Sequence, residues 1–336
     1  MVPPANEQAG VKSVLITGCS GEIGSALVRT LLLDPEIERV VGVDVRPPDG
    51  FHGGRFDFTA RDVREPLDAL LRQHGINTVV HAAFVVHPIH NTALQYAIDV
   101  AGTRSVVQSA AAAKVESFVH LSSATVYGAH ADQQEPIPEE SPPRPNRGFV
   151  YAENKVAAEG IVEQFRREAA FRAVTVLRPS FVAGPNSRNA LFRHISRRFA
   201  VLPGAQSPLQ LTHIEDLIEI LRRVIHRTTD GIFNVGADGA LTASQMMARL
   251  HNYSLTVPYP ALRSLGAIAW KMRLSWLTNV PEEAIALLRH PWRVKTQAVQ
   301  SALDFRFRYD TRAAFEDFAE AELRKRFTAA RRTCAK

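Results

Sequence analysis

A glycine-rich turn between an apolar segment and a helical segment constrains this chain more than any other feature. Residues 12–17 read Lys-Ser-Val-Leu-Ile-Thr, a short β-rich run, and Gly18, Gly21 and Gly24 follow before a helix expected to end near Leu33. In this context the first glycine permits a tight turn, the second lets a pyrophosphate approach the backbone, and the third lets the helix pack on the strand. The helix amides would then face the phosphates. This order predicts a dinucleotide-binding βαβ unit.

An acidic residue ends the next expected strand, Arg39–Asp44. A carboxylate at this position of a dinucleotide-binding fold bonds the ribose 2′-hydroxyl and repels a 2′-phosphate. Arg46 follows two residues later and would favour a phosphate, but the strand-end position of Asp44 favours NAD over NADP.

Strands and helices are expected to alternate along most of the chain. Further strands are predicted at 77–81, 117–122, 173–178, 210–213 and 231–235, and helices at 66–74, 92–113, 149–169, 189–199 and 214–225. Such alternation with right-handed crossovers predicts an α/β fold, a Rossmann-type doubly wound parallel sheet. We expect an NAD-binding domain over residues 10–180, completed by segments near 210–240, and a smaller mixed substrate-facing lobe with C-terminal helices over residues 181–330.

Tyr151 and Lys155 are four residues apart, which places both side chains on one face of the expected helix 149–169. An ammonium beside a phenol favours the phenolate, whose ordinary pKa is about 10, so Tyr151 could act as a general acid or base. Ser123 follows the strand 117–122 and could donate a hydrogen bond to a substrate oxygen. The tyrosine-lysine pair alone would more often belong to the exposed face of an amphipathic helix, since the pattern has only two fixed positions.

The composition is that of an ordinary globular protein, with 336 residues of which 46% are hydrophobic and 22% charged. The net charge of +6 comes from scattered basic residues without a nucleic-acid motif.

Cys19 and Cys334 indicate neither a disulfide framework nor a metal site. The first ten residues lack a signal-peptide pattern, and the uncharged segment 76–98 contains too many Asn, Gln and His residues for a membrane span. We therefore expect a cytoplasmic protein that acts on a small molecule, without an integral membrane segment, metal or nucleic-acid partner.

Together these residues resemble the extended short-chain dehydrogenase/reductase family, in its NAD-dependent epimerase/dehydratase branch, and are similar to UDP-glucose 4-epimerase-like members. The resemblance covers residues 12–240 in motif order. Its motifs are Thr17-Gly18-x-x-Gly21-x-x-Gly24 for the cofactor loop, Asp62-Val63 for the pair that contacts the adenine, His81-Ala82-Ala83 for the strand end beneath the cofactor, and Ser123, Tyr151 and Lys155 for the catalytic set.

The resemblance implies hydride transfer between C4 of the nicotinamide and a carbinol carbon. In it, Tyr151 moves the hydroxyl proton, Lys155 lowers the tyrosine pKa and holds the ribose, and Ser123 orients the oxygen. It also implies a homodimer built on helices 92–113 and 149–169. The implied cofactor-binding residues are Gly18, Gly21, Ile23, Gly24, Asp44, Asp62, Val63, Ala82, Ala83, Tyr151, Lys155 and Pro179, and the substrate-binding residues are Thr125 and Phe181.

Three positions depart from the family pattern. Phe181 stands where sugar-nucleotide members carry Asn, Leu209 stands where they carry Arg, and Asp99 replaces the usual Asn. The first two changes remove groups expected to hold a nucleotide diphosphate.

Three functions therefore remain open. The first is a sugar or nucleotide-sugar epimerase or a related NAD-dependent enzyme. The second is a 3β-hydroxysteroid-type or other lipid-alcohol dehydrogenase, favoured by Phe181, Leu209 and the apolar segment 259–277, which would equally suit ordinary core packing. The third is a non-catalytic NAD-binding protein.

Overall fold

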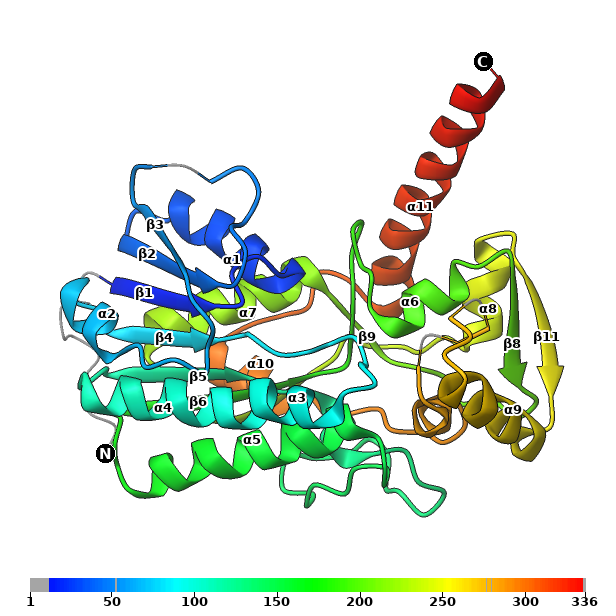
Figure 1. The fold of residues 1–336 in the computed structure, drawn as a ribbon, viewed down its shortest axis with the longest axis horizontal. Coiled ribbons are helices and arrows are strands. Elements are labelled where there is room, and N and C mark those ends of the chain that lie inside the picture. The colour runs from blue at the N-terminus through cyan, green and yellow to red at the C-terminus, as the bar shows by residue number, and fades with distance from the viewer. Residues whose placement is uncertain (1–11, 52, 276, 279, 335–336) are drawn as a thin grey trace.

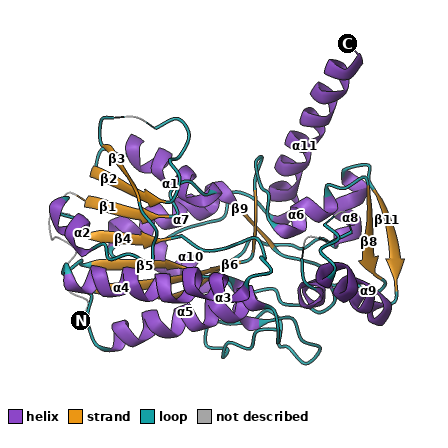
Figure 2. Ribbon diagram, viewed as in Figure 1, coloured by secondary structure: helices purple, strands orange, loops and turns teal. Residues whose placement is uncertain are grey.

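The computed structural model describes residues 12–51, 53–275, 277–278 and 280–334. Seven parallel strands form its central sheet in the order β10-β6-β5-β4-β1-β2-β3 (Figures 1 and 2). They are β1 (Lys12–Thr17), β2 (Ile37–Asp44), β3 (Phe56–Ala60), β4 (Thr78–His81), β5 (Ser117–Leu121), β6 (Ala173–Pro179) and β10 (Gly231–Val235). The expected doubly wound parallel sheet is confirmed. Its strand order reverses between β1 and β4, where such sheets open a ligand crevice.

Helices cover both faces of the sheet (Figure 2). One face carries α1 (Glu22–Leu33), α7 (Ile214–Arg227) and α10 (Gln297–Leu303), and the other carries α2 (Asp68–Gln73), α4 (Gly102–Ala112) and α5 (Val150–Arg167). Strands β1 and β4 are buried along their whole length, and their centres, Val14–Ile16 and Val79–Val80, are accordingly apolar. The two apolar layers hold the strand ends, and with them the site, in fixed positions.

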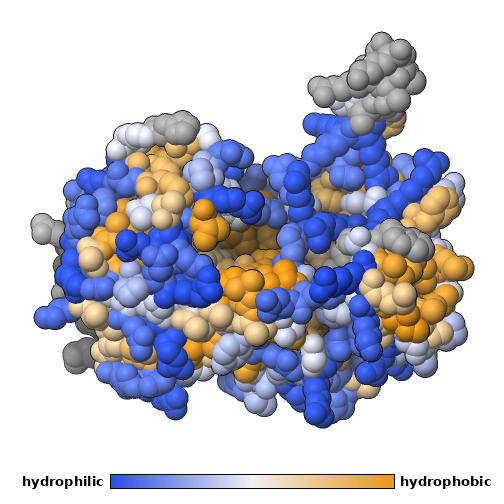
Figure 3. Space-filling view, viewed as in Figure 1, coloured by the Kyte–Doolittle hydropathy of each residue, from blue (hydrophilic) through white to orange (hydrophobic). Residues whose placement is uncertain are grey.

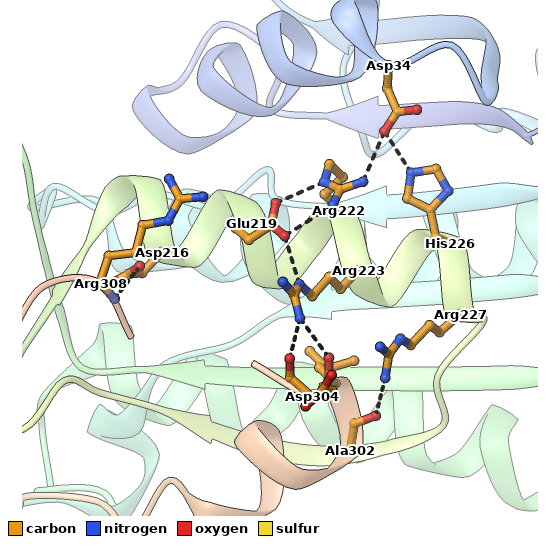
Figure 4. A network of polar contacts seen from close by, with 11 residues as sticks. Asp34, Asp216, Glu219, Arg222, Arg223, His226, Arg227, Ala302, Asp304 and Arg308 are labelled. Atoms are coloured by element: carbon orange, nitrogen blue, oxygen red, sulfur yellow. Dashed lines mark hydrogen bonds and ion pairs between the residues drawn. The ribbon is translucent and has the colours of Figure 1, made fainter. Parts of the chain in front are cut away.

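Polar contacts attach α7 to its neighbours (Figure 4). Glu219 accepts hydrogen bonds from Arg222 and Arg223, and the Nε2 atom of His226 lies 2.7 Å from a carboxylate oxygen of Asp34 at the end of α1. Arg223 also donates to the carbonyl oxygen of Leu303 in α10, at 3.0 Å. These contacts join helices that are far apart in the sequence.

The helix expected over residues 92–113 is interrupted by a π-helical turn. It begins as α3 (Thr92–Tyr96), passes through the π turn Ala97–Ala101 and continues as α4. Such turns change the direction of side chains and are frequent at functional sites. Here the turn contains Asp99, whose side chain is fully buried.

The C-terminal lobe differs from the sequence expectation in several elements. The helix expected over residues 189–199 is short, α6 (Ala190–Ile195), and residues Phe199–Pro203 instead form strand β8, which pairs with β11 (Tyr253–Val257). The mixed segment 240–292 contains α8 (Ala243–Arg249), β11, α9 (Tyr259–Lys271) and the 3₁₀ segment Glu282–Leu288. The lobe also includes the strand pair β7 (Phe181–Ala183) and β9 (Leu211–His213).

The last helix, α11 (Thr311–Cys334), begins against β9 and projects away from the body of the molecule (Figure 1). Among the described residues, no helix is both long enough and apolar enough to cross a membrane.

Candidate active site

The glycine turn after β1 is shaped for close backbone approach. Gly18 has a φ of +72°, and a Cβ atom there would lie 2.7 Å from backbone atoms of Ala83 at the end of β4. A Cβ on Gly24 would lie 2.2 Å from the carbonyl oxygen of Gly18, so only glycine lets α1 start so close to the turn. The amino terminus of α1 thereby opens on the crevice at the strand ends, where its free amides can hold phosphate oxygens.

Two acidic residues lie on the same side of the crevice. Asp44 ends β2, and its carboxylate accepts hydrogen bonds from the backbone amides of Ser20, at 3.1 Å, and Arg46, at 3.4 Å. The carboxylate of Asp62 is engaged by Arg64 at 2.7 Å, and this hydrogen bond lowers the Asp62 pKa. Asp44 is therefore held at the strand end by backbone amides, whereas Asp62 is neutralised by the side chain of its neighbour.

Ser123, Thr125 and Tyr151 meet on the opposite wall. Ser123 caps the 3₁₀ turn Ala124–Tyr127 after β5, and its Oγ accepts hydrogen bonds from the backbone amide and the hydroxyl of Thr125, at 3.2 and 2.9 Å. Burial raises the pKa of Tyr151 to about 12, while a side-chain hydrogen bond with Ser123 acts to lower it. The Ser123 hydroxyl thus lies next to Thr125 and close enough to Tyr151 to influence its pKa.

Lys155 lies one helical turn beyond Tyr151 and is buried, with 3% of its surface exposed. Its ammonium donates to the carbonyl oxygen of Leu121, at 2.7 Å, and lies 3.5 Å from the centre of the Phe84 ring. Burial lowers the pKa of Lys155 to about 7, against the charges of Asp99 and Glu159, which act to raise it. An exposed amphipathic face for this residue pair is therefore wrong, because the helix turns both residues toward the interior.

Asp99 is placed to support the lysine charge. Its carboxylate accepts hydrogen bonds from the backbone amide of Val85, at 2.8 Å, and from the side-chain amide of Asn154, at 3.0 Å. Burial raises the pKa of Asp99, and these bonds and the Lys155 charge oppose that effect. The acid at this family-atypical position thus favours the charged form of Lys155.

Sequence reasoning missed two groups of residues around the site. Phe84 follows the expected Ala82-Ala83 motif, contacts Tyr151 edge-on with ring centres 5.7 Å apart, and covers the Lys155 ammonium. Beneath the site, Glu159 and Arg178 form a buried ion pair at 2.7 Å. Their signals in the sequence are one aromatic residue after a strand and two charges on a helix and a strand, and these gain meaning only once the elements are packed together.

The positions that depart from the family pattern fall in different places. Phe181 lies on the cavity wall, edge-on to Trp292 with ring centres 5.2 Å apart. Leu209 has 1% exposure and is bonded through its backbone to Leu241, so its side chain belongs to the core rather than to the cavity. The apolar residue at 209 therefore cannot contribute to the substrate site directly.

One cavity of about 1500 Å³ runs between the sheet and the C-terminal lobe, and the hollow is visible in Figure 3. All the site residues predicted from the sequence line it: Gly18, Gly21, Ile23, Gly24, Asp44, Asp62, Val63, Ala82, Ala83, Ser123, Thr125, Tyr151, Lys155, Pro179 and Phe181. No group of three potential metal-ligating side chains occurs among the described residues.

Comparison with known proteins agrees with this geometry. Residues 14–236 match the Epimerase family model, described as the NAD dependent epimerase/dehydratase family. The chain belongs to this family. The expectation of an NAD-dependent enzyme of the extended short-chain dehydrogenase/reductase type is thereby confirmed, with NAD as the cofactor.

Individual relatives share only 28% or 23% of the aligned residues with this chain. The uncharacterized protein Rv0501 of Mycobacterium tuberculosis is 28% identical over 315 residues, which are 91% of this chain and 83% of that protein. The N-acetyl-alpha-D-glucosaminyl-diphospho-ditrans,octacis-undecaprenol 4-epimerase of Escherichia coli O157:H7 is 23% identical over 262 residues, 74% of this chain and 76% of that protein. The structure of MoeE5 in complex with UDP-glucuronic acid and NAD superposes with a TM-score of 0.72 and 23% identity, covering 93% of this chain and 99% of that one.

Proposed function

We propose that this chain catalyses NAD-dependent oxidation at a carbinol carbon of a sugar or nucleotide-sugar, followed by re-reduction, as an epimerase or a related enzyme. The observation that carries the proposal is the convergence of Ser123, Tyr151 and Lys155 on one wall of a cavity whose other end contains the glycine turn and Asp44. Support also comes from the relative named as a 4-epimerase of a lipid-linked amino sugar.

The cofactor would be held by the α1 amides at its pyrophosphate, by Asp44 at the adenosine ribose and by Lys155 at the nicotinamide ribose. These residues fit the dinucleotide because the turn at Gly18 leaves no room for a side chain and Asp44 lines the cavity. When bound, NAD supplies the hydride acceptor for the carbinol carbon.

In the proposed reaction the Tyr151 phenolate takes the substrate hydroxyl proton while the carbinol carbon loses its hydride, which leaves a ketone. Ser123 donates a hydrogen bond to the same oxygen and stabilises the charge that develops on it. Burial raises the Tyr151 pKa and the Asp99 charge acts in the same direction. The charged ammonium of Lys155, 5.9 Å from the centre of the Tyr151 ring, would oppose both effects and favour the phenolate. Return of the hydride to the other face of the ketone, with the proton given back by Tyr151, would complete an epimerisation.

A lipid-alcohol dehydrogenase is the second candidate, and a specific observation favours it. The substrate end of the cavity is lined by apolar side chains of α9, β8 and β11, and Phe181 occupies the wall where an amide is expected. Two arginines nevertheless line the cavity there, Arg188 and Arg197, and the Arg197 guanidinium already donates to the carbonyl oxygens of Leu277 and Ser275. Phosphate recognition therefore remains chemically available to the site.

The test is the Tyr151→Phe variant, with Tyr96→Phe as the matched control because Tyr96 is 53% exposed on α3 and does not line the cavity. Tyr151→Phe should keep the fold and NAD binding but slow hydride transfer about a hundredfold or more. The readout is NADH absorbance with candidate alcohols and product analysis with UDP-sugars. Net NADH formation from a hydroxysteroid would favour the second candidate, and UDP-sugar conversion without net NADH would favour the first. Equal rates for Tyr151→Phe and the parent would refute the proposed role.

A further inference from the structure

The cavity continues past Tyr151 into the C-terminal lobe. Its volume of about 1500 Å³ exceeds the roughly 300–1,000 Å³ that is usual for a single small-ligand site. The far wall consists of residues from β8, β11 and α9, which belong to the C-terminal lobe and lie away from the glycine turn (Figure 1). The cavity therefore has room for a second extended ligand beside the cofactor.

The outer face of the β8–β11 pair is apolar and exposed. The parallel register aligns Phe199 with Tyr253 and Val201 with Leu255, and the two rings stack with centres 5.4 Å apart. Phe199, Tyr253 and Leu255 are 69%, 61% and 64% exposed, whereas Leu202 on the opposite face is fully buried. The solvent-facing side of a sheet ordinarily carries polar residues, so this reversal needs a ligand or partner to explain it.

Helix α9 presents a matching apolar stripe. Leu262, Leu265, Gly266 and Ala269 recur at the spacing of one helical face, and all four line the cavity. Trp270 of the same helix stacks on His90, with ring centres 4.0 Å apart, which ties α9 to the loop after β4. The helix therefore faces the same space as the β8–β11 pair. In Figure 3 the surface over α9 is predominantly hydrophobic.

We call these residues the apolar trough: Phe199, Val201, Tyr253, Leu255, Leu265 and Ile268. Eight of the 14 exposed large hydrophobic residues in the described part of the chain lie between positions 199 and 277. Exposed apolar residues gathered in this way mark a binding surface rather than chance exposure. Among its described residues, the C-terminal lobe contributes no carboxylate to the cavity wall, and its charged lining residues there are Arg188 and Arg197.

We propose that the apolar trough holds the hydrocarbon chain of an amphiphilic substrate whose carbinol head group lies at Tyr151. The inference rests on the proposed function and specifies its substrate class. A hydrocarbon chain is the occupant that fits because the trough is continuous with the wall that bears Tyr151, so head and tail can belong to one molecule. A phosphate linking them would meet Arg188 and Arg197. The Glu22 carboxylate of α1 also lies on this wall, where it accepts a hydrogen bond from Ser187. A relative named for an undecaprenol-linked substrate shows that such amphiphiles occur among similar proteins.

The test uses n-alkyl β-D-glucosides from hexyl to dodecyl, each below its micelle concentration, bound to the NAD-loaded protein and measured by calorimetry. A buried methylene contributes about 0.8 kcal/mol, so affinity should rise about fourfold per methylene until the trough is filled. The double variant Leu255→Ser, Leu265→Ser should reduce that increment to about twofold or less. Leu33→Ser is the matched control, because Leu33 is 85% exposed at the end of α1 and lies off the cavity.

NAD affinity and thermal unfolding establish that each variant is folded. Affinity that does not change with chain length in the parent protein would overturn the inference. The inference would also be overturned if the double variant kept the full affinity gain per methylene but lost self-association or binding to phosphatidylcholine vesicles. The apolar trough would then belong to a contact with a second copy of the chain or with a bilayer. Chain-dependent binding without hydride transfer to any alcohol would leave the inference standing and refute the proposed function. Hydride transfer from short glucosides, with an affinity that does not depend on chain length, would support the proposed function and refute the inference.

Discussion

Replacing Lys155 by methionine should make the ligand-free protein more stable near neutral pH while it removes function. Lys155 is 3% exposed, and burial lowers its pKa from 10.5 to about 7. Because each pKa unit corresponds to about 1.4 kcal/mol, holding the charged ammonium in the folded protein costs at most roughly 5 kcal/mol. Methionine fills a similar volume without a charge. Removing the donor to the Leu121 carbonyl oxygen costs about 1–3 kcal/mol, so the net gain expected at or below pH 7 is about 2–4 kcal/mol.

The gain should depend on pH in a defined direction. A lysine whose folded-state pKa lies below its unfolded value binds fewer protons in the folded state between about pH 7 and pH 10.5. The parent therefore becomes more stable relative to the variant as pH rises through that window, by at most about 1.4 kcal/mol per pH unit. Above pH 10.5 the advantage of methionine should vanish and the lost hydrogen bond should make the variant the less stable protein.

Urea unfolding of parent and variant without NAD, from about pH 6 to about pH 9, measures this difference. Lys271→Met serves as the control, since Lys271 is exposed on α9 and its replacement should change stability little at any pH. The variant Lys155→Met should also bind NAD more weakly and turn over slowly, because one ammonium serves both the ribose and Tyr151. A stability difference between parent and Lys155→Met that is the same at every pH would refute the reasoning.

Three further predictions follow from the site and its support. NAD should bind at least about tenfold tighter than NADP in competition titrations, and Asp44→Ala should shrink that preference; equal affinities in the parent would contradict the assigned role. Gly24→Ala should abolish NAD binding in the same titrations, because its Cβ would lie 2.2 Å from the Gly18 carbonyl oxygen, and retained affinity would show that α1 can shift. Glu159→Gln should lower the free energy of unfolding, measured in urea, by about 3–5 kcal/mol, because the buried Arg178 loses its counter-charge. Neutralising Glu316, whose side chain is 42% exposed, should cost at most about 1 kcal/mol, and equal costs would argue against a special role for the buried pair.

The sequence by itself determined the nucleotide half of the molecule. Strands such as β1 and β4 are covered on both faces, so their central residues are apolar and the pattern can be recognised locally. The glycines after β1 are required by backbone geometry within one turn. The ends of parallel strands must meet at one edge of the sheet, and this rule alone assigns Asp44, Ser123 and Pro179 to one crevice.

Elements stabilised by distant partners were not predictable in this way. Strand β3 is a short edge strand with one buried residue, Phe56, so its alternation of apolar and polar residues is weak. The helix expected over residues 189–199 ends at Ile195 instead, and residues 199–203 form a strand that pairs with Tyr253–Val257, more than 50 positions further along the chain. Pairing of this kind overrides local propensity, because what stabilises a strand is its neighbour in the sheet.

Only the tertiary structure decided how buried the functional groups are. The sequence places Tyr151 and Lys155 on one helical face, but it does not show that β5 and Phe84 cover that face. The burial that results from this packing lowers the pKa of Lys155. Likewise the apolar residues of α9 and β11 could have formed an ordinary core. Burial depends on which surfaces meet in the folded protein. Because none of the described elements covers the outer face of β8 and β11, the apolar residues there stay exposed and line the cavity.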